Sequence, residues 1–401
     1  MFALIAVIGI LVFTPSSGVA ADEPQLVTVR TGDELRKAVA AAVPGTRIEV
    51  AAGTYENGFH FTELHGAPGK PVVIAAKDPA NPPVFRGSGA GIQLTDPQYV
   101  ELEGLTFSGQ TGNGVNVDDG GTPATPARHV VLRKLVVRDI GPTGNHDGIK
   151  LSGLEDFRVE GCIVERWGSG GSAVDMVGCR RGTIERCELR HSEGAVGASG
   201  VQAKGGTRDV VIRRNRFHNA GARGVNVGGS TGLEYFRPPL PEWKGPKFEA
   251  KDIRVEGNTF IGCDTPVAFV GSDGGVFRFN TVYLPGRWTM RVLQETRAEG
   301  FVASRGGEFT DNIVVFRSDR WSEGGVNSGA NTEPKSFTFA RNFWFCADAP
   351  ARTRDLVRLP APEKGGGVYG EDPKFRDVEK ADLRLITGSP AAKFGATALA
   401  E

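Results

Sequence analysis

The sequence predicts an all-β fold, a right-handed parallel β-helix, and three observations support this class. Nine short segments of alternating apolar and polar residues align on one template, as expected of strands with one buried face. Their shared position recurs at spacings of 30, 27, 25, 28, 43, 22, 32 and 30 residues, which is typical of a solenoid. No helical pattern lies between the segments, so parallel strands are joined by turns and βαβ units are excluded. A leucine-rich repeat is the alternative solenoid, but its LxxLxL pattern is missing.

The shared position carries asparagine in the later coils and apolar residues in the earlier ones. It is occupied in chain order by Leu105, Leu135, Cys162, Cys187, Asn215, Asn258, Asn280, Asn312 and Asn342. In coils stacked ~4.8 Å apart, an inward-turned Asn amide can hydrogen-bond to the Asn above and below it. Asparagine also tolerates the turn conformation that such a bend needs. We therefore expect a buried asparagine ladder.

The five cysteines are expected to be buried thiols. Cys162 and Cys187 occupy one position in successive coils, so both side chains point the same way, which does not suit a disulfide. Cys179, Cys263 and Cys346 show no CxxC spacing, and no zinc site is expected.

Composition and the N-terminal segment narrow the class of protein. The 401 residues carry 47 Lys and Arg against 47 Asp and Glu, so charge does not favour binding to nucleic acid. Residues 1–21 resemble a secretory signal, with an apolar run over 2–13 and small residues at 19–21. No other stretch reaches the ~18 apolar residues of a membrane span. We expect a secreted or periplasmic monomer in which residues 22–401 form one domain.

Both ends of the solenoid need a cap, because an open coil exposes strand edges. Thr31 and Glu34 resemble a capping box before a helical stretch over 34–42, which can cover the first coil. The region from about 347 to 401 is expected to close the other end, with 372–391 as its terminal segment.

An insertion at about 230–250 accounts for the longest gap between repeats. It carries the aromatic residues Tyr235, Phe236, Trp243 and Phe248 beside Arg237, Lys244 and Lys247. The loop either packs its aromatic rings on the solenoid wall or forms one wall of a ligand cleft, since long ordered loops often carry function.

A second strand of each coil also aligns, from 114–119 to 289–294. Apolar residues at its second and fourth places point inward, so the third and fifth places point outward, ~4.8 Å from their neighbours. The third place reads Asn116, Lys150, Asp175, Gln202, Asn226, Ala268 and Arg291; the fifth includes Lys204, and the position before the strand includes Asp147 and Arg223. This row is either an ordinary polar surface, with ion pairs worth ~0–1 kcal/mol, or a binding groove beside the insertion.

The segments GTYE (53–56), YVELEGLTF (99–107) and DPKFRD (372–377) accompany the predicted solenoid. On these segments and on its architecture, the chain resembles the pectate-lyase-like superfamily, and within it the chondroitinase B and alginate lyase group. The resemblance implies a lysine base on a strand, which matches Lys204, and an assisting arginine, whose position falls at Gly228. The acidic Ca²⁺ ligands of that group have no counterpart before Lys204.

A second resemblance is to polygalacturonase-type glycoside hydrolases. Asn145-His146-Asp147-Gly148-Ile149 is similar to their Asn-Thr-Asp-Gly-Ile element, whereas their Gly-His-Gly is missing. This resemblance implies hydrolysis by Asp147 and Asp175; an inverting pair needs carboxyl groups ~6.5–9.5 Å apart.

The leading hypothesis is β-elimination on an acidic, uronic-acid-containing polysaccharide. Removing the C5 proton needs a base, and a lysine can serve where neighbouring cations lower an ammonium pKa. The candidate catalytic residues are Lys204, Arg223, Lys150 and, as an alternative base, His146. The candidate substrate-binding residues are Gln202, Asn226, Asn116, Tyr235, Trp243 and Arg237, and Asp147 with Asp175 are candidate Ca²⁺ ligands. C5-epimerisation starts with the same step, and a non-catalytic carbohydrate-binding or adhesion solenoid is a further alternative.

Overall fold

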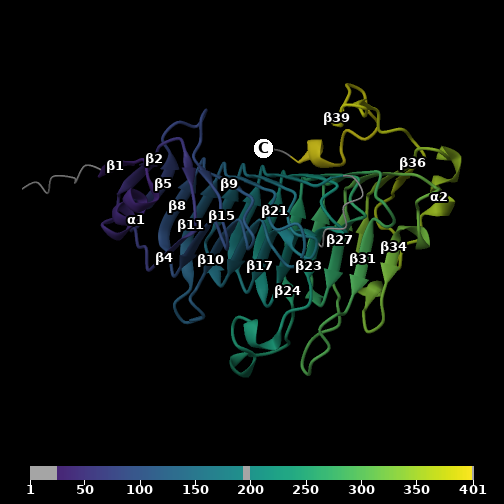
Figure 1. The fold of residues 1–401 in the computed structure, drawn as a ribbon. Coiled ribbons are helices and arrows are strands. Elements are labelled where there is room, and N and C mark those ends of the chain that lie inside the picture. The colour runs from purple at the N-terminus through teal and green to yellow at the C-terminus, as the bar shows by residue number, and fades with distance from the viewer. Residues whose placement is uncertain (1–24, 193–198, 400–401) are drawn as a thin grey trace, which may run out of the picture.

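The computed structural model describes residues 25–192 and 199–399, and the expected signal segment at 1–21 lies outside these residues. The chain forms a right-handed parallel β-helix, as predicted (Figure 1). Three long sheets of parallel strands form its wall, and the hydrophobic core lies between them. No helix in the described part of the chain is long and apolar enough to cross a membrane.

Each full coil passes through sheets C, A and B in that order. Sheet C contains β4 (Phe59–Thr62), β7 (Ile92–Thr95), β10 (Val115–Asp118), β13 (Ile149–Ser152), β17 (Ser172–Val177), β20 (Ser199–Lys204), β23 (Arg223–Gly228), β27 (Thr265–Val270), β31 (Met290–Leu293) and β34 (Val326–Ser328). Sheet A contains β1 (Leu26–Val29), β2 (Arg47–Val50), β5 (Val72–Ala76), β8 (Gln98–Glu103), β11 (Ala127–Arg133), β14 (Leu154–Glu155), β15 (Arg158–Glu160), β18 (Arg180–Glu185), β21 (Thr207–Arg213), β24 (Ala250–Lys251), β25 (Arg254–Glu256), β28 (Ser272–Asp273), β29 (Val276–Arg278), β32 (Glu308–Thr310) and β35 (Thr338–Ala340). Sheet B contains β3 (Thr54–Tyr55), β6 (Val84–Phe85), β9 (Thr106–Ser108), β12 (Val136–Arg138), β16 (Ile163–Glu165), β19 (Glu188–Arg190), β22 (Arg216–His218), β26 (Thr259–Ile261), β30 (Thr281–Tyr283), β33 (Ile313–Phe316), β36 (Phe343–Cys346) and β37 (Val368–Tyr369).

The asparagine ladder is confirmed. The Nδ2 atom of Asn215 donates to Oδ1 of Asn258 at 3.0 Å, and Asn258 donates in the same way to Asn280 at 3.0 Å. Asn312 continues the ladder to Asn342, which donates to the Glu363 carboxylate at 2.8 Å. All five asparagines are buried. The ladder therefore satisfies the amides of the turns between sheets A and B, where water cannot reach them.

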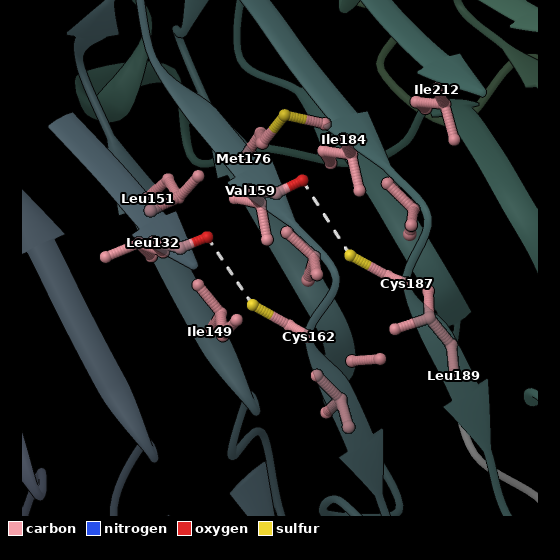
Figure 2. Close-up of a cluster of buried hydrophobic side chains, with 14 of the residues drawn as sticks. Leu132, Ile149, Leu151, Val159, Cys162, Met176, Ile184, Cys187, Leu189 and Ile212 are labelled. Carbon is pink, nitrogen blue, oxygen red and sulfur yellow. Dashed lines mark hydrogen bonds between the residues drawn. The ribbon is translucent and has the colours of Figure 1, made fainter. Parts of the chain in front are cut away.

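The earlier coils fill the same position with thiols and apolar side chains. Figure 2 shows the Cys162 and Cys187 thiols pointing at carbonyl oxygens of the preceding coil, those of Leu132 at 3.5 Å and Val159 at 3.7 Å. All five cysteines are buried and unpaired, as predicted. Burial raises the pKa of Cys179 and of Cys263 to about 12, so these thiols are not reactive thiolates at neutral pH.

The N-terminal cap is the helix α1 (Gly32–Ala40). Thr31 caps it by accepting a hydrogen bond from the Glu34 backbone, and Leu35 and Val39 pack against the core. The helix begins two residues earlier than predicted, because the Thr31 cap directly precedes Gly32.

The C-terminal region has two separate roles. The short helix α2 (Thr353–Leu356) and β37 lie at the last coil, and Leu356 packs against the core. The segment predicted to close this end instead turns back, through the antiparallel pair β38 (Phe375–Asp377) and β39 (Asp382–Leu385), along the outer face of sheet B (Figure 1). Ala391 and Phe394 pack there against apolar side chains of β33 and β36.

The predicted register of sheet C is confirmed strand by strand. Lys150 pairs with Asn116 on one side and with Asp175 on the other. The same row continues through Gln202, Asn226, Ala268 and Arg291 to Asn327. Long connections follow β10, β23 and β31 at one edge of this sheet (Figure 1). The short 3-10 helices are Leu233–Tyr235, Leu240–Glu242, Glu323–Gly325, Pro334–Ser336, Pro350–Arg352 and Ala396–Ala398.

Candidate functional site

Two lysines and two aspartates form a lysine–aspartate cluster on the outer face of sheet C. Lys150, Asp175 and Lys204 lie on the neighbouring strands β13, β17 and β20, and Asp147 lies just before β13. The Lys150 ammonium contacts Asp175 and lies 3.5 Å from Oδ2 of Asp147. Lys204 approaches Asp175 from the other side, with its Nζ atom 3.5 Å from Oδ2. Asp147 also accepts a 2.7 Å hydrogen bond from the Ser172 backbone. The parallel register brings these residues together although up to 57 positions separate Asp147 from Lys204.

The two aspartates of the cluster are buried, although they lie on the outer face that the strand pattern predicts. Asp147 is 2% exposed and Asp175 is 1% exposed, while Lys150 and Lys204 remain partly exposed. Burial, followed by the negative charge of Asp175, raises the pKa of Asp147 to about 6, although Lys150 opposes the shift. Burial lowers the pKa of Lys150, but the two carboxylates outweigh it and the pKa is raised overall. Lys150 is therefore a permanent cation at neutral pH.

A pocket of about 400 Å³ opens beside this cluster, between sheet C and the 230–249 loop. Its lining residues are Asn145, Lys150, Ser152, Val177, Lys204, Ser230, Thr231, Gly232, Tyr235 and Arg237. We call it the lysine pocket. It brings together four of the residues predicted as catalytic or substrate-binding: Lys150, Lys204, Tyr235 and Arg237. Asn145, which the sequence indicated only as part of a motif, also contributes to its wall.

Arg237 anchors the loop that forms one wall of the lysine pocket. Its guanidinium binds the carboxylate of Asp119 through two hydrogen bonds, 2.5 Å from Nε to Oδ2 and 2.7 Å from Nη2 to Oδ1. The backbone N–H of Arg237 donates to the Gly205 carbonyl at 3.0 Å. Asp119 is fully buried, so this ion pair fixes the loop to the solenoid. The positive charge of Arg237 is thus already paired.

The aromatic residues of the insertion divide between the two roles considered for the loop. Phe236 and Phe248 are buried, and the Trp243 ring packs against both, with centroid distances of 6.2 and 4.9 Å. The Trp243 indole N–H donates to the Pro246 carbonyl. Trp243, predicted to bind substrate, therefore has a packing role and does not line the lysine pocket. Tyr235 is 58% exposed at the pocket and is available to a ligand.

Glu249 is a buried carboxylate that no repeat or motif in the sequence indicates. It is inaccessible to solvent and accepts hydrogen bonds from the Gly205 N–H, the Thr231 N–H and hydroxyl, and the Thr296 hydroxyl. Gly205 directly follows Lys204, and Thr231 lines the lysine pocket. Glu249 thereby ties together the turns that follow β20, β23 and β31. Only the folding of the insertion brings its carboxylate to these donors.

Gln202 and Asn226, predicted as substrate ligands, lie beside Gly229 at the edge of the pocket. A Cβ atom on Gly229 would lie 2.5 Å from Nε2 of Gln202 and 3.5 Å from Nδ2 of Asn226, so glycine leaves these amides room. Gly229 has a φ of +152°, which favours glycine. Asn226 is 1% exposed, and its Nδ2 atom has no hydrogen-bond partner in the described part of the chain. An unpartnered buried donor here suits an acceptor supplied by a ligand.

The remaining predicted residues lie outside the lysine pocket. Arg223, predicted to assist Lys204, binds Glu295 at 2.7 Å and Asn226 at 3.3 Å in this structure. His146 packs against the glycine turn at 141–144. Asn116 lies one strand before Lys150 and donates to Asp118 at 3.0 Å.

The predicted Ca²⁺ ligands are arranged around an ammonium group. Asp147 and Asp175 are close enough to share one cation, and the side chain between them is that of Lys150. Ca²⁺ takes ~6–8 oxygen ligands, whereas no group of three or more His, Cys, Asp or Glu side chains suited to a metal occurs in residues 25–192 and 199–399. The donor set therefore fits a lysine cluster better than a calcium site.

Comparison with known proteins agrees with the fold. A model of the family described as "Right handed beta helix region" matches residues 90–237. No curated protein matches the chain in sequence.

Several solved structures share the architecture. An alginate lyase from Paenibacillus sp. str. FPU-7 is 18% identical over 76% of this chain and 99% of its own, with a TM-score of 0.51. Pectate lyase Pel9A is 13% identical over 92% and 91% of the two chains, with a TM-score of 0.56. The A-module of Azotobacter vinelandii mannuronan C-5 epimerase AlgE4 is 13% identical over 88% and 97%, with a TM-score of 0.53. The TM-scores and coverage show a common fold, and at these low identities the comparison establishes the fold alone.

Proposed function

We propose that this chain binds an acidic polysaccharide at the lysine pocket and cleaves it by β-elimination at a uronic acid residue. The observation that carries the proposal is the convergence of Lys150, Lys204 and Tyr235 on one pocket of about 400 Å³. Cations attract a carboxylate, and the hydroxyl and amide groups of the lining suit sugar hydroxyls. The similar β-helix structures named as alginate lyase and pectate lyase support this class of substrate.

The reaction needs three chemical roles at adjacent atoms of the substrate. A base removes the C5 proton, a cation stabilises the negative charge that develops on the C6 carboxylate, and an acid protonates the departing O4 oxygen. The C5–H and C4–O bonds break, a C4=C5 double bond forms, and the leaving chain takes a proton. No oxidant or second substrate is required.

The pocket residues fit these roles on the basis of charge and exposure. Lys150 is held protonated by Asp147 and Asp175, so it serves as the fixed cation facing the substrate carboxylate. Lys204 shares Asp175 with Lys150, and this carboxylate is already neutralised by the closer Lys150 contact. We assign the base to Lys204 for this reason. Tyr235, exposed at the pocket wall, is our candidate donor to the leaving oxygen.

The alternative reactions differ in what they demand of the same residues. Hydrolysis would use Asp147 and Asp175 as acid and base, but both carboxyl groups are buried and contact Lys150. C5-epimerisation needs the same proton removal, followed by reprotonation from the opposite side. A binding or adhesion protein needs the pocket without turnover. A secreted or periplasmic location, expected from residues 1–21, would place the chain where such polymers occur.

The test is turnover of a panel of uronate polymers: alginate, polygalacturonate and chondroitin sulfate. We expect one of them to yield ultraviolet-absorbing unsaturated ends, and Lys204→Met to reduce the rate at least 100-fold. Lys251→Met, a lysine on sheet A that lies 4.0 Å from Asp273, is the matched control and should retain the rate. New reducing ends without this absorbance would indicate hydrolysis, and a change in uronate configuration without cleavage would indicate epimerisation. Full activity of the Lys204→Met variant would show that Lys204 is not the base.

A further inference from the structure

The outer face of sheet C is electrically asymmetric about the lysine pocket. On the N-terminal side, β4, β7 and β10 present His60 and Thr62, Gln93 and Thr95, and Asn116 and Asp118, with no lysine or arginine among them. The charge of Asp118 contributes, after burial and Asp119, to raising the pKa of Asp96 on the same side. These strand positions therefore offer a polyanion no cation.

Arginines gather on the C-terminal side instead. Arg223 begins β23, Arg291 lies in the central row of β31, and Arg287 precedes that strand. Arg287 and Arg291 both lie over the ring of Trp288, with their Cζ atoms 4.1 and 4.7 Å from its centroid. The buried indole thus holds two guanidinium groups at one place on the face.

The charge of this arginine group is incompletely balanced. Arg223 pairs with Glu295, whereas neither Arg287 nor Arg291 has a carboxylate within ion-pair distance among the described residues. Within residues 25–192 and 199–399, the hydrogen-bond acceptor of Arg291 is the amide oxygen of Asn327, at 2.9 Å. Burial and then the charge of Arg223 lower the pKa of Arg291, although the carboxylates of Glu295 and Asp264 oppose the shift. A bound anion would relieve both penalties.

The row of sheet C connects the lysine pocket with the arginine group. Arg291 lies five strands beyond Lys150, and steps of ~4.8 Å place them about 24 Å apart. Gln202 and Asn226 lie between them, and the unpartnered Nδ2 of Asn226 points to a missing acceptor. The loops that follow β23 and β31 pack together through Phe236 and Phe301, with ring centroids 5.2 Å apart, so one continuous wall borders this stretch.

We propose that an acidic polymer bound at the lysine pocket extends only toward the C-terminal coils, where Arg287 and Arg291 bind a second carboxylate of the same chain. This inference deepens the proposed function and rests on it for the identity of the polymer. It sets the polarity of binding along the solenoid. It also requires a substrate long enough to span the lysine pocket and the arginine group.

The experiment compares short and long oligomers on immobilised protein, with analyte renewed by flow so that turnover does not deplete it. Trisaccharides and decasaccharides of alginate and of polygalacturonate are the probes. We expect one decasaccharide to bind at least tenfold more tightly than its trisaccharide. The Arg287→Gln/Arg291→Gln double variant should lose about tenfold for the decasaccharide and less than twofold for the trisaccharide.

Two control variants are needed. One tests whether the loss of any arginine weakens binding, and the other tests whether the polymer extends toward the N-terminal coils. Arg278→Gln, which removes an arginine paired with Glu256 on sheet A, should leave both affinities unchanged. Gln93→Ala, on the N-terminal side of the face, should also leave the decasaccharide affinity unchanged. Equal losses for both oligomer lengths, no loss at all, or no binding of either decasaccharide would overturn the inference.

The same measurements distinguish this inference from the proposed reaction. Length-dependent binding that requires the two arginines, without unsaturated products, would retain the polymer site and reject β-elimination. Cleavage of a polymer with full affinity in the double variant would retain the reaction and reject the arginine site.

Discussion

The Nζ atom of Lys204 lies 3.5 Å from the Oδ2 atom of Asp175, and Lys150 contacts the same oxygen from the opposite neighbouring strand. One buried carboxylate oxygen thus faces the side-chain nitrogen atoms of two lysines. The Oδ1 atom of Asp175 has no hydrogen-bond partner in the described structure. This arrangement makes Asp175 the residue on which the geometry of both lysines depends.

Asp175→Asn should therefore both destabilise the fold and disable the lysine pocket. Removing one partner of a buried ion pair costs on the order of 3 kcal/mol, because the remaining charges stay poorly solvated. Urea unfolding measures this cost, and oligouronate binding measures the pocket. Asp273→Asn, which removes a partly exposed partner of Arg305 on sheet A, should cost less than ~1 kcal/mol. Equal costs for the two variants would contradict the role of Asp175.

The stability of the protein should fall as pH rises from about 4 to about 6 through the contribution of Asp147. Its pKa is raised by burial to about 6, so the folded protein binds a proton here that the unfolded chain has released. The contribution of Asp147 to the free energy of unfolding is therefore larger below pH 4 than above pH 6, by on the order of 2–3 kcal/mol. Asp147→Asn removes this dependence, so the wild-type minus variant difference in unfolding free energy should decrease across that window. A difference that is constant between pH 4 and 7 would show that the pKa is unshifted.

Glu249→Gln should loosen the wall of the lysine pocket. The carboxylate accepts bonds from Gly205, Thr231 and Thr296, and an amide NH₂ would face donors in at least one of these contacts. We expect a loss of on the order of 2–3 kcal/mol in stability and faster proteolysis within 230–249. Glu299→Gln, at an exposed position of the neighbouring loop, is the control. Unchanged proteolysis of the loop would show that its position does not depend on Glu249.

Asn280→Ala tests the ladder as a source of stability. The change removes the acceptor of the Asn258 N–H and side-chain amide and leaves the Val255 carbonyl without its donor. Unfolding free energy should fall by on the order of 2–4 kcal/mol, since these groups are inaccessible to water. Asn81→Ala, at an exposed position, should change it by less than ~0.5 kcal/mol. Similar losses of unfolding free energy in both variants would show that the hydrogen bonds of the ladder do not stabilise the fold.

Removal of divalent metal should leave the reaction on uronate polymer unchanged, because the Lys150 ammonium lies between the two carboxylates that would bind Ca²⁺. The measurement is the initial rate after dialysis against chelator, with and without added Ca²⁺. Restoration of a lost rate by Ca²⁺, but not by Mg²⁺, would show that a calcium site forms when substrate is bound.

The repeat pattern was sufficient to predict the outward row of sheet C and the asparagine ladder in correct register. Both depend on a period that each coil repeats, so local sequence carries the information. It also placed Lys150 beside Asp175 and Lys204 near both. The pattern did not predict that Asp175 and Asn226 are buried. An outward-pointing side chain can still be covered by its neighbours, and the strand pattern does not determine which side chains are covered.

The sequence by itself determined the coil, its register and the position of the lysines, since stacking at a fixed period leaves one consistent alignment. The tertiary structure alone decided what the insertion does with them. Arg237 binds Asp119, which lies 118 positions earlier in the chain. Glu249 accepts hydrogen bonds from residues of three turns, and Glu295 forms an ion pair with Arg223. These contacts lie between loops of different coils, where no repeat constrains the partner, so only the folded chain selects it.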